Sequence, residues 1–226
     1  KFIRKKQLFS FLKYKPKMIL EGDYHYRNRS FFTSMFGKKI LPLAVDYDFL
    51  NFKVNEHFIP IKKAIFTTRS DRNIDFLLNC WSEISHKTIN SSLYINPPYN
   101  LSDEQIKSGI KLRVKGNKSK LINELSTARV MLNPGHKGEV YCLAAEEARE
   151  LCVPIVTLGI GSLSERVEHD VTGYIAKNSS EFIYYTIKIL NDNNCYLKLK
   201  KNLIKRRNIR SYKDVAIDFL DIINDD

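Results

Sequence analysis

Two glutamates, Glu139 and Glu147, stand eight positions apart in a segment that runs from a loop into a predicted helix. Carboxylates offer pairs of hydrogen-bond acceptors to the hydroxyls of a sugar or a ribose. A helix N-terminus next to them offers backbone N–H groups to an anion. The segment therefore predicts part of a pocket for a phosphorylated, hydroxyl-rich ligand.

The loop at 133–138 follows a predicted strand, and we expect the next helix to span residues 140–151, with Glu139 at its opening. The backbone N–H groups of Val140, Tyr141 and Cys142 would then face the strand ends and favour a diphosphate. Glu147, two turns into the helix, would accept from a ribose diol, and Glu139 from sugar hydroxyls. The alternative is an ordinary solvated helix face, which the adjacent Glu146 supports.

A second strand-to-helix loop, at 67–73, carries Arg69 and Arg72. Arginine binds phosphate oxygens through two parallel N–H groups, so both residues are candidates for a phosphate clamp. In the alternative interpretation Asp71 caps the helix and the arginines lie on the surface. The two interpretations are compatible.

Other kinds of site find less support. Gly159 and Gly161 follow a predicted strand, but Ser164 replaces the third glycine of a dinucleotide-binding loop, so we expect no nicotinamide cofactor. The five histidines and four cysteines have no metal-ligand spacing, so we expect no metal, and we interpret His136 as a loop residue near the pocket.

Composition bounds the class of protein. The 226 residues are 43% hydrophobic and 27% charged, as in an ordinary globular protein, and no apolar run is long enough to span a bilayer. We expect four reduced thiols and a cytoplasmic location. Because the chain begins with Lys1 rather than methionine, we also expect it to be part of a longer protein.

The net charge of +12 is concentrated in two blocks without acids, at residues 1–20 and 198–213. Such blocks can bind nucleic acid or an anionic membrane, but no recognition motif accompanies them. We therefore favour solvated helix faces and expect no specific nucleic acid partner. The basic, aromatic first 15 residues could contact a membrane peripherally, although we favour packing against another part of their own domain.

Strands and helices alternate along most of the chain. We predict strands at 17–20, 39–45, 63–68, 92–95, 110–114, 129–132, 154–157 and 173–176. We predict helices at 8–15, 26–36, 71–85, 118–126, 140–151, 164–168, 180–191, 194–207 and 211–223. This alternation predicts an α/β fold with a Rossmann-like parallel sheet flanked by helices, and ligands beyond the carboxyl ends of the strands. Residues 46–52 are predicted to be a linker, and with a domain boundary between 46 and 60 we expect a small unit at 1–50 and the main domain at 51–226.

Residues 129–176 resemble the donor-binding half of retaining glycosyltransferases of the GT-B fold, family four. That family has a Glu-Gly-Phe-Gly-Leu segment, then Glu-Ala, Gly-Val-Pro-Val-Val, Gly-Gly-x-x-Glu and Thr-Gly. The chain keeps this register without a gap, at Glu139, Tyr141, Leu143, Glu147-Ala148, Val153-Pro154, Gly161, Glu165 and Thr172-Gly173. The segment 39–46 resembles the family's interdomain segment, Arg69 its first-loop arginine, and Val114–Gly116 its loop near the base.

The resemblance implies a nucleotide-diphosphate sugar as donor substrate and a retaining mechanism without an obligatory metal. It implies that Glu147 binds ribose, that Glu139 acts at the sugar, and that Arg69, with Arg72 standing in for the family's lysine, holds phosphate. Around them, Val114, Gly116, Gly138, Val140, Tyr141, Cys142 and Leu143 would bind the donor. Residues 1–50 would be a C-terminal remnant of the acceptor-side domain.

The chain departs from the family where Val140, Cys142 and Cys152 replace glycines. The leading hypothesis is a hexosyltransferase of polysaccharide biosynthesis, or its donor-binding part, acting on an unknown glycan, lipid or protein acceptor. A non-catalytic nucleotide-sugar-binding or interaction module is the alternative, and a basic nucleic-acid-binding protein is a weaker one.

Overall fold

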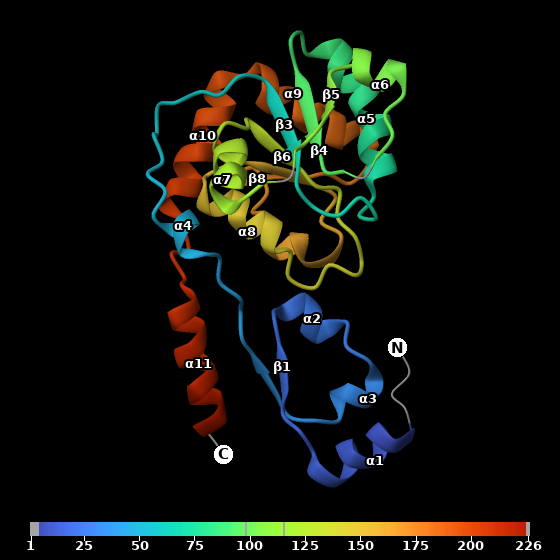
Figure 1. The fold of residues 1–226 in the computed structure, drawn as a ribbon, viewed down its shortest axis with the longest axis vertical. Coiled ribbons are helices and arrows are strands. Elements are labelled where there is room, and N and C mark those ends of the chain that lie inside the picture. The colour runs from blue at the N-terminus through green and yellow to red at the C-terminus, as the bar shows by residue number, and fades with distance from the viewer. Residues whose placement is uncertain (1–4, 98, 115, 225–226) are drawn as a thin grey trace.

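The main domain is a six-stranded, all-parallel sheet covered by helices on both faces (Figure 1). The computed structural model describes residues 5–97, 99–114 and 116–224. The strands of the sheet are β3 (Lys63–Phe66), β4 (Ser92–Ile95), β5 (Ile110–Leu112), β6 (Val130–Leu132), β7 (Ile155–Thr157) and β8 (Gly173–Ile175). The helices around it are α5 (Ile74–Lys87), α6 (Asp103–Lys107), α7 (Lys118–Ser126), α8 (Leu143–Glu150), the 3-10 helix η1 (Gly161–Glu165), α9 (Ser179–Asn191) and α10 (Asn193–Lys205).

The short strands are buried on both sides because successive side chains enter two different cores. Ala64 and Phe66 of β3 pack into the core beneath α5, α9 and α10. Ile65, between them, packs into the opposite core with α7 and α8. The predicted α/β class and the Rossmann-like, GT-B-type sheet are therefore confirmed.

The order of the strands locates the functional edge of the sheet. From one edge to the other the order is β5, β4, β3, β6, β7, β8. The strands β3, β4 and β5 are added in one direction across the sheet. The chain then returns to the other side of β3, where β6, β7 and β8 are added in the opposite direction. Ligands of open parallel sheets bind where the direction of building reverses, beyond the carboxyl ends of β3 and β6.

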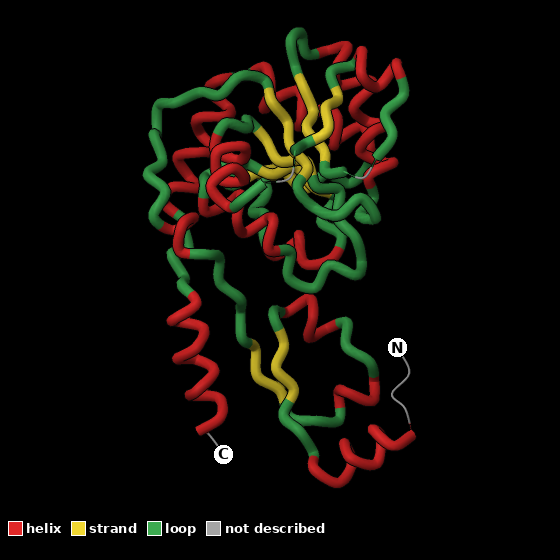
Figure 2. Tube along the Cα trace, in the orientation of Figure 1, coloured by secondary structure: helices red, strands yellow, loops and turns green. Residues whose placement is uncertain are grey.

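Residues before β3 form a smaller unit with its own two-stranded parallel sheet, visible apart from the main sheet in Figure 2. Its elements are α1 (Lys5–Tyr14), β1 (Met18–Leu20), α2 (Asp23–Arg27), α3 (Phe31–Ser34) and β2 (Lys38–Ile40), followed by α4 (Tyr47–Leu50). The C-terminal helix α11 (Tyr212–Asn224) leaves the main domain and runs beside this unit, where Lys17 Nζ donates to the carbonyl of Ile222 at 3.4 Å (Figure 1).

Direct contacts hold the smaller unit against the main domain. The Tyr24 hydroxyl donates to the Lys137 carbonyl at 2.9 Å, and the Tyr24 backbone N–H donates to the Glu165 carboxylate. The Tyr141 hydroxyl donates to the Leu43 carbonyl at 2.6 Å. Residues of the smaller unit therefore lie at the carboxyl-end edge of the main sheet.

Several expected elements differ from the prediction. The strand expected at 39–45 ends at Ile40, and the helix expected at 164–168 is the 3-10 helix η1. The single helix at 26–36 is instead two short helices, because Ser30 accepts a hydrogen bond from the Thr33 N–H and begins a new helix after a break. The linker expected at 46–52 contains α4, whose N-terminus Asp46 caps by accepting from the Asp48 N–H. In both places a side-chain cap starts a helical turn that hydrophobic periodicity does not reveal.

Candidate functional site

The loops after β3 and β6 enclose a hollow of about 360 Å³ at the point where the sheet reverses direction. Six predicted site residues after β6 lie in the unbroken stretch 138–143, and both candidate arginines come from the loop after β3. The lining residues are Glu21, Leu43, Thr67, Thr68, Arg69, Arg72, Gly138, Glu139, Val140, Tyr141, Cys142, Leu143 and Ala144. The structure thus brings together residues that lie about 70 positions apart in the sequence.

The two arginines of the β3 loop occupy different environments. The Arg69 side chain is 75% exposed and pairs with Asp71 at 2.9 Å. The Arg72 side chain is 17% exposed, and its Nε lies 3.6 Å from the Glu139 carboxylate. Its Nη1 lies 2.6 Å from the His136 ring nitrogen Nδ1. Arg72 is therefore the arginine held inside the site, while Arg69 stands at its solvent edge.

The helix that was expected to begin at 140 begins instead at Leu143. Cys142 has φ = 62° and ψ = 70°, a left-handed conformation that cannot continue into a right-handed helix. The free N–H groups of the helix N-terminus therefore belong to Leu143 and Ala144, not to Val140 and Tyr141. Both residues line the hollow, so the helix dipole still favours an anion there.

Short contacts fix the loop that carries Glu139. The buried Asn133 side chain accepts from the Gly135 N–H at 3.1 Å, and Asn73 from the facing loop donates to the Gly135 carbonyl at 2.6 Å. The Glu139 carbonyl accepts from the Ser162 N–H at 2.9 Å. Glu139 is thus held by the 3-10 helix η1 rather than by α8.

A second hollow of about 310 Å³ adjoins the first, and Leu143 lines both. Glu147 and Gly116 lie in the wall of this second hollow and not in that of the first, so Glu139 and Glu147 do not line one common hollow. The other lining residues of the second hollow are Val45, Asp46, Phe49, Asn117, Lys118, Leu121 and Tyr212. Asp46 and Lys118 form an ion pair of 2.6 Å at its edge. Val114 is 67% exposed and lines neither hollow.

Burial, opposed by the positive charge of Arg113 and assisted by the negative charge of Asp46, raises the pKa of Glu147 to about 7. The Glu147 carboxylate forms no hydrogen bond or ion pair with the residues that the structure describes. Its neighbour Glu146 is 4% exposed and pairs with Arg149 and Arg166, each at 2.9 Å. The two adjacent glutamates therefore differ: the Glu146 carboxylate is paired within the fold, while the Glu147 carboxylate has no partner among the described residues.

Several lining residues were not anticipated. The Thr67 and Thr68 hydroxyls are buried without a hydrogen-bond partner in the described part of the chain, and both line the first hollow. Their position at the end of a predicted buried strand could have indicated them as site residues, but only the arginines of the same loop were predicted to bind a ligand. Glu21, Leu43 and Tyr212 come from distant segments, so no local pattern could have indicated them.

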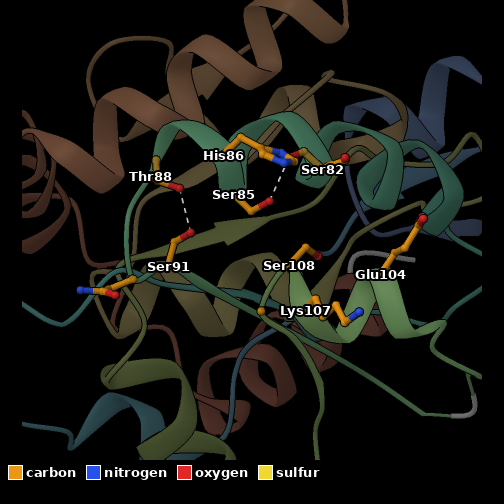
Figure 3. A pocket seen from close by; sticks show the side chains of 10 residues that line it. Ser82, Ser85, His86, Thr88, Ser91, Glu104, Lys107 and Ser108 are labelled. Atoms are coloured by element: carbon orange, nitrogen blue, oxygen red, sulfur yellow. Dashed lines mark hydrogen bonds between the residues drawn. The ribbon is translucent and has the colours of Figure 1, made fainter.

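The most voluminous of the hollows lies elsewhere, between α5 and α6, and has about 710 Å³ (Figure 3). It adjoins Ser91 and Gly109, which precede β4 and β5, so it belongs to the amino-end edge of the sheet. Its hydroxyls bond to one another or to helix carbonyls: Thr88 Oγ1 lies 2.7 Å from Ser91 Oγ, and Ser108 donates to the Gln105 carbonyl at 2.8 Å. This hollow is a polar groove whose hydrogen bonds are internal.

Four of the eight cations in the C-terminal basic block pair with acids within the fold. Lys198 pairs with Asp170 at 3.0 Å, and Arg206 pairs with Glu168 at 2.9 Å. Arg207 pairs with the buried Glu150 at 3.3 Å, and Arg210 pairs with Asp218. The block therefore offers fewer unpaired charges to the backbone of a nucleic acid than its sequence indicates.

Comparison with known proteins agrees with this geometry. Residues 98–207 match the family model described as Glycosyl transferases group 1, whereas no curated protein matches the sequence significantly. Pneumococcal O-GlcNAc transferase GtfA, in complex with UDP and GlcNAc, is 13% identical with a TM-score of 0.75, covering 98% of this chain and 47% of that one. A TarM mutant from S. aureus, in complex with fondaparinux, alpha-GlcNAc-glycerol and UDP, is 16% identical with a TM-score of 0.72, covering 97% and 46%.

HepE from Anabaena, in complex with UDP-glucose, is 11% identical with a TM-score of 0.73, covering 99% of this chain and 68% of that one. The chain thus spans between about half and two thirds of the length of these solved structures. No helix among the described residues is long and apolar enough to cross a membrane. The chain has the fold of the GT-B glycosyltransferases, and its residues 98–207 match the family model of the glycosyl transferases group 1.

Proposed function

We propose that this chain binds the nucleotide-diphosphate sugar of a retaining hexosyltransferase. The observation that carries the proposal is the meeting of Arg72, Glu139 and the N-terminus of α8 in one hollow, beside a second hollow that contains Glu147. An anion site next to a free carboxylate fits the diphosphate and the ribose of such a donor. The proposal also draws on UDP and UDP-glucose in the named complexes of similar fold.

In this arrangement Arg72 and the N–H groups of Leu143 and Ala144 hold the diphosphate. Glu147 accepts hydrogen bonds from the ribose diol, and Glu139 accepts from the sugar. When the bond between the anomeric carbon and the diphosphate breaks, the electron pair leaves with the diphosphate. Arg72 and the helix dipole stabilise that developing charge, which is electrostatic catalysis.

The acceptor oxygen forms the new bond to the anomeric carbon on the face from which the diphosphate leaves, and the acceptor's proton passes to the departing phosphate. No cofactor or metal is required in this scheme, since cationic and dipolar groups of the chain meet the charge. We propose a glycan acceptor in polysaccharide biosynthesis as the first class to test, because the TarM and GtfA complexes of similar fold contain alpha-GlcNAc-glycerol and GlcNAc, respectively. A cytoplasmic location, where nucleotide sugars are made, fits this role.

Calorimetry with UDP-glucose, UDP-GlcNAc and GDP-mannose tests the proposal directly. We expect one of them to bind, and Glu147→Ala to weaken that binding by about ten-fold or more, since a charged hydrogen bond contributes ~1.5–3 kcal/mol. Addition of EDTA should leave the affinity unchanged. Absence of binding by all three nucleotides, with the fold intact by circular dichroism, would contradict the proposal.

The second candidate is a non-catalytic nucleotide-sugar-binding module. It is favoured by Val140 and Cys142, which replace motif glycines and leave a cysteine in a left-handed conformation at the mouth of the hollow. Donor hydrolysis or transfer to a glycan by the protein that contains this chain would distinguish the two. Binding without any turnover across a panel of acceptors favours the module.

A further inference from the structure

A hydrogen bond links Arg72 to His136 across the two loops of the first hollow. Arg72 Nη1 lies 2.6 Å from His136 Nδ1, and the Gly138 backbone N–H lies 2.9 Å from the same nitrogen. Guanidinium and backbone N–H groups can only donate. His136 Nδ1 therefore accepts from both, and the proton of the neutral ring resides on Nε2.

This bond determines where the arginine can lie. Two carboxylates attract its guanidinium: Glu139 at 3.6 Å and Asp71 at 3.8 Å, both measured to Nε. His136 Nδ1 instead accepts a hydrogen bond from Nη1, which lies on another edge of the guanidinium plane. Nη2 makes no hydrogen bond with the residues that the structure describes, so its hydrogens stay available for a ligand.

His136 is itself held firmly. The Gly138 N–H bond closes a tight turn around its ring, and its own carbonyl accepts from the Glu139 N–H at 2.9 Å. Gly161 packs against that carbonyl so closely that a Cβ there would lie 2.4 Å from the oxygen. A histidine fixed on such a loop can hold the flexible side chain of Arg72 in one conformation. Less conformational entropy of Arg72 is then lost when a ligand binds.

We propose that His136 is a positioning residue that orients Arg72 toward the diphosphate of the donor. The inference rests on the proposed function for its ligand, but the contact between the two side chains is a property of the free protein. His136 acts through Arg72 and need not touch the donor.

A matched pair of substitutions tests this role. Asparagine places its oxygen on Cγ, close to where histidine has Nδ1, and so keeps an acceptor for Arg72; leucine has similar bulk and no acceptor. We expect His136→Leu to weaken binding of UDP-glucose by about five- to ten-fold in calorimetry, and His136→Asn to recover most of the loss. Equal losses in the two variants would overturn the proposal.

A double-mutant cycle separates positioning from direct contact. In an Arg72→Ala background, His136→Leu should cause no further loss, because the residue on which it acts is gone. A further loss equal to that in the wild-type background would show that His136 acts on its own, and would overturn the proposal. Thermal melting of each variant reports whether the fold is intact.

Nitrogen-15 NMR of the histidine rings provides a readout that does not depend on the donor. We expect His136 Nδ1 to have the shift of an unprotonated, hydrogen-bonded nitrogen at pH 7.5, and to change in Arg72→Ala. A protonated Nδ1, or a nitrogen-15 chemical shift of Nδ1 that is the same in the wild type and in Arg72→Ala, would overturn the inference for any ligand. Conversely, if no nucleotide binds the wild type while the Arg72-dependent shift is present, the proposed function fails and the His136–Arg72 contact stands.

Discussion

The guanidinium Nε of Arg72 lies 3.6 Å from the carboxylate of Glu139, across the point where the sheet changes direction. One residue follows β3 and the other follows β6, so their contact depends on the parallel pairing of those two strands, in which Ala64 faces Val130 and Ile65 faces Met131. The ion pair joins the group proposed for the diphosphate to the group proposed for the sugar.

The two arginines of the β3 loop should therefore differ in function. We expect Arg72→Ala to weaken UDP-glucose binding by about ten-fold or more, because it removes a charged donor held inside the site. Arg69→Ala should change the affinity by less than about three-fold, since the Arg69 side chain is 75% exposed and paired with Asp71. Calorimetry on both variants checks this, with Arg72→Lys as a charge-preserving control. A larger loss in Arg69→Ala would reverse the assignment.

The ionisation of Glu147 should make donor binding depend on pH. Burial raises its pKa to about 7, so the carboxylate that accepts from a ribose diol is mostly protonated at pH 6 and mostly ionised at pH 8. We expect the affinity for UDP-glucose to rise several-fold over this interval. UDP-glucose is a suitable probe because its diphosphate does not titrate there. The rise should be much smaller in Glu147→Gln; an equal rise in that variant would assign it to another group.

The same carboxyl should lower stability as the pH rises. Folding raises its pKa, so the unfolded state loses this proton near the ordinary glutamate pKa of 4.5, and the folded state loses it near pH 7. Its contribution to stability is therefore greatest below pH 4.5 and declines up to about pH 7. We expect Glu147→Gln to be more stable than the wild type at pH 8 by ~1–2 kcal/mol, and to lose this advantage at pH 4. Urea unfolding at the two pH values measures it.

The glycine at 161 should be essential to the loop that carries Glu139. Its φ is 75°, and an added Cβ would lie 2.4 Å from the His136 carbonyl and 2.9 Å from the Glu139 carbonyl. We expect Gly161→Ala to destabilise the protein by ~2 kcal/mol or more, since both backbone strain and a backbone clash result. Gly37→Ala is the matched control, because nothing lies within 4 Å of the added carbon. Comparable unfolding midpoints for the two variants would contradict this prediction.

The smaller unit should bind anionic lipid vesicles. Phe9 on α1 is 73% exposed and Phe31 on α3 is 87% exposed, while Phe11 packs against Phe32 and Phe36 to hold these helices together. Exposed aromatics among basic residues favour an anionic membrane interface. We expect Phe9→Ser with Phe31→Ser to reduce cosedimentation with phosphatidylglycerol vesicles several-fold. The control Ile89→Ser removes a 78% exposed side chain of the main domain and should have no effect. Equal binding to neutral vesicles would contradict an electrostatic contribution.

The sequence by itself determined the main sheet and its helices. Short apolar runs separated by amphipathic segments predicted the strands and α5, α7, α9, α10 and α11 close to their observed bounds, because burial of both faces forces strands such as β3 to be apolar throughout. It also placed Glu139, Glu147 and Arg72 on loops or helices at one edge of the sheet. Even the replaced glycines were informative: Cys142 and Cys152 both have positive φ, at 62° and 57°, so the backbone keeps the conformation for which glycine is suited.

Only the tertiary structure decided which of these side chains face the site. Glu146 and Glu147 are neighbours of the same type, and Arg69 and Arg72 share one loop, yet the two members of each pair have different surroundings. Glu146 is paired inside the fold while the Glu147 carboxylate has no partner among the described residues, and Arg69 is exposed at the rim of the hollow while Arg72 is largely buried in it. These surroundings depend on partners distant in sequence, such as Arg166 for Glu146 and His136 for Arg72. The start of α8 at Leu143 likewise depends on η1, which holds Glu139 outside the helix. Local secondary-structure propensity cannot predict such contacts, because they form only when the folded sheet brings loops that are distant in sequence to one edge.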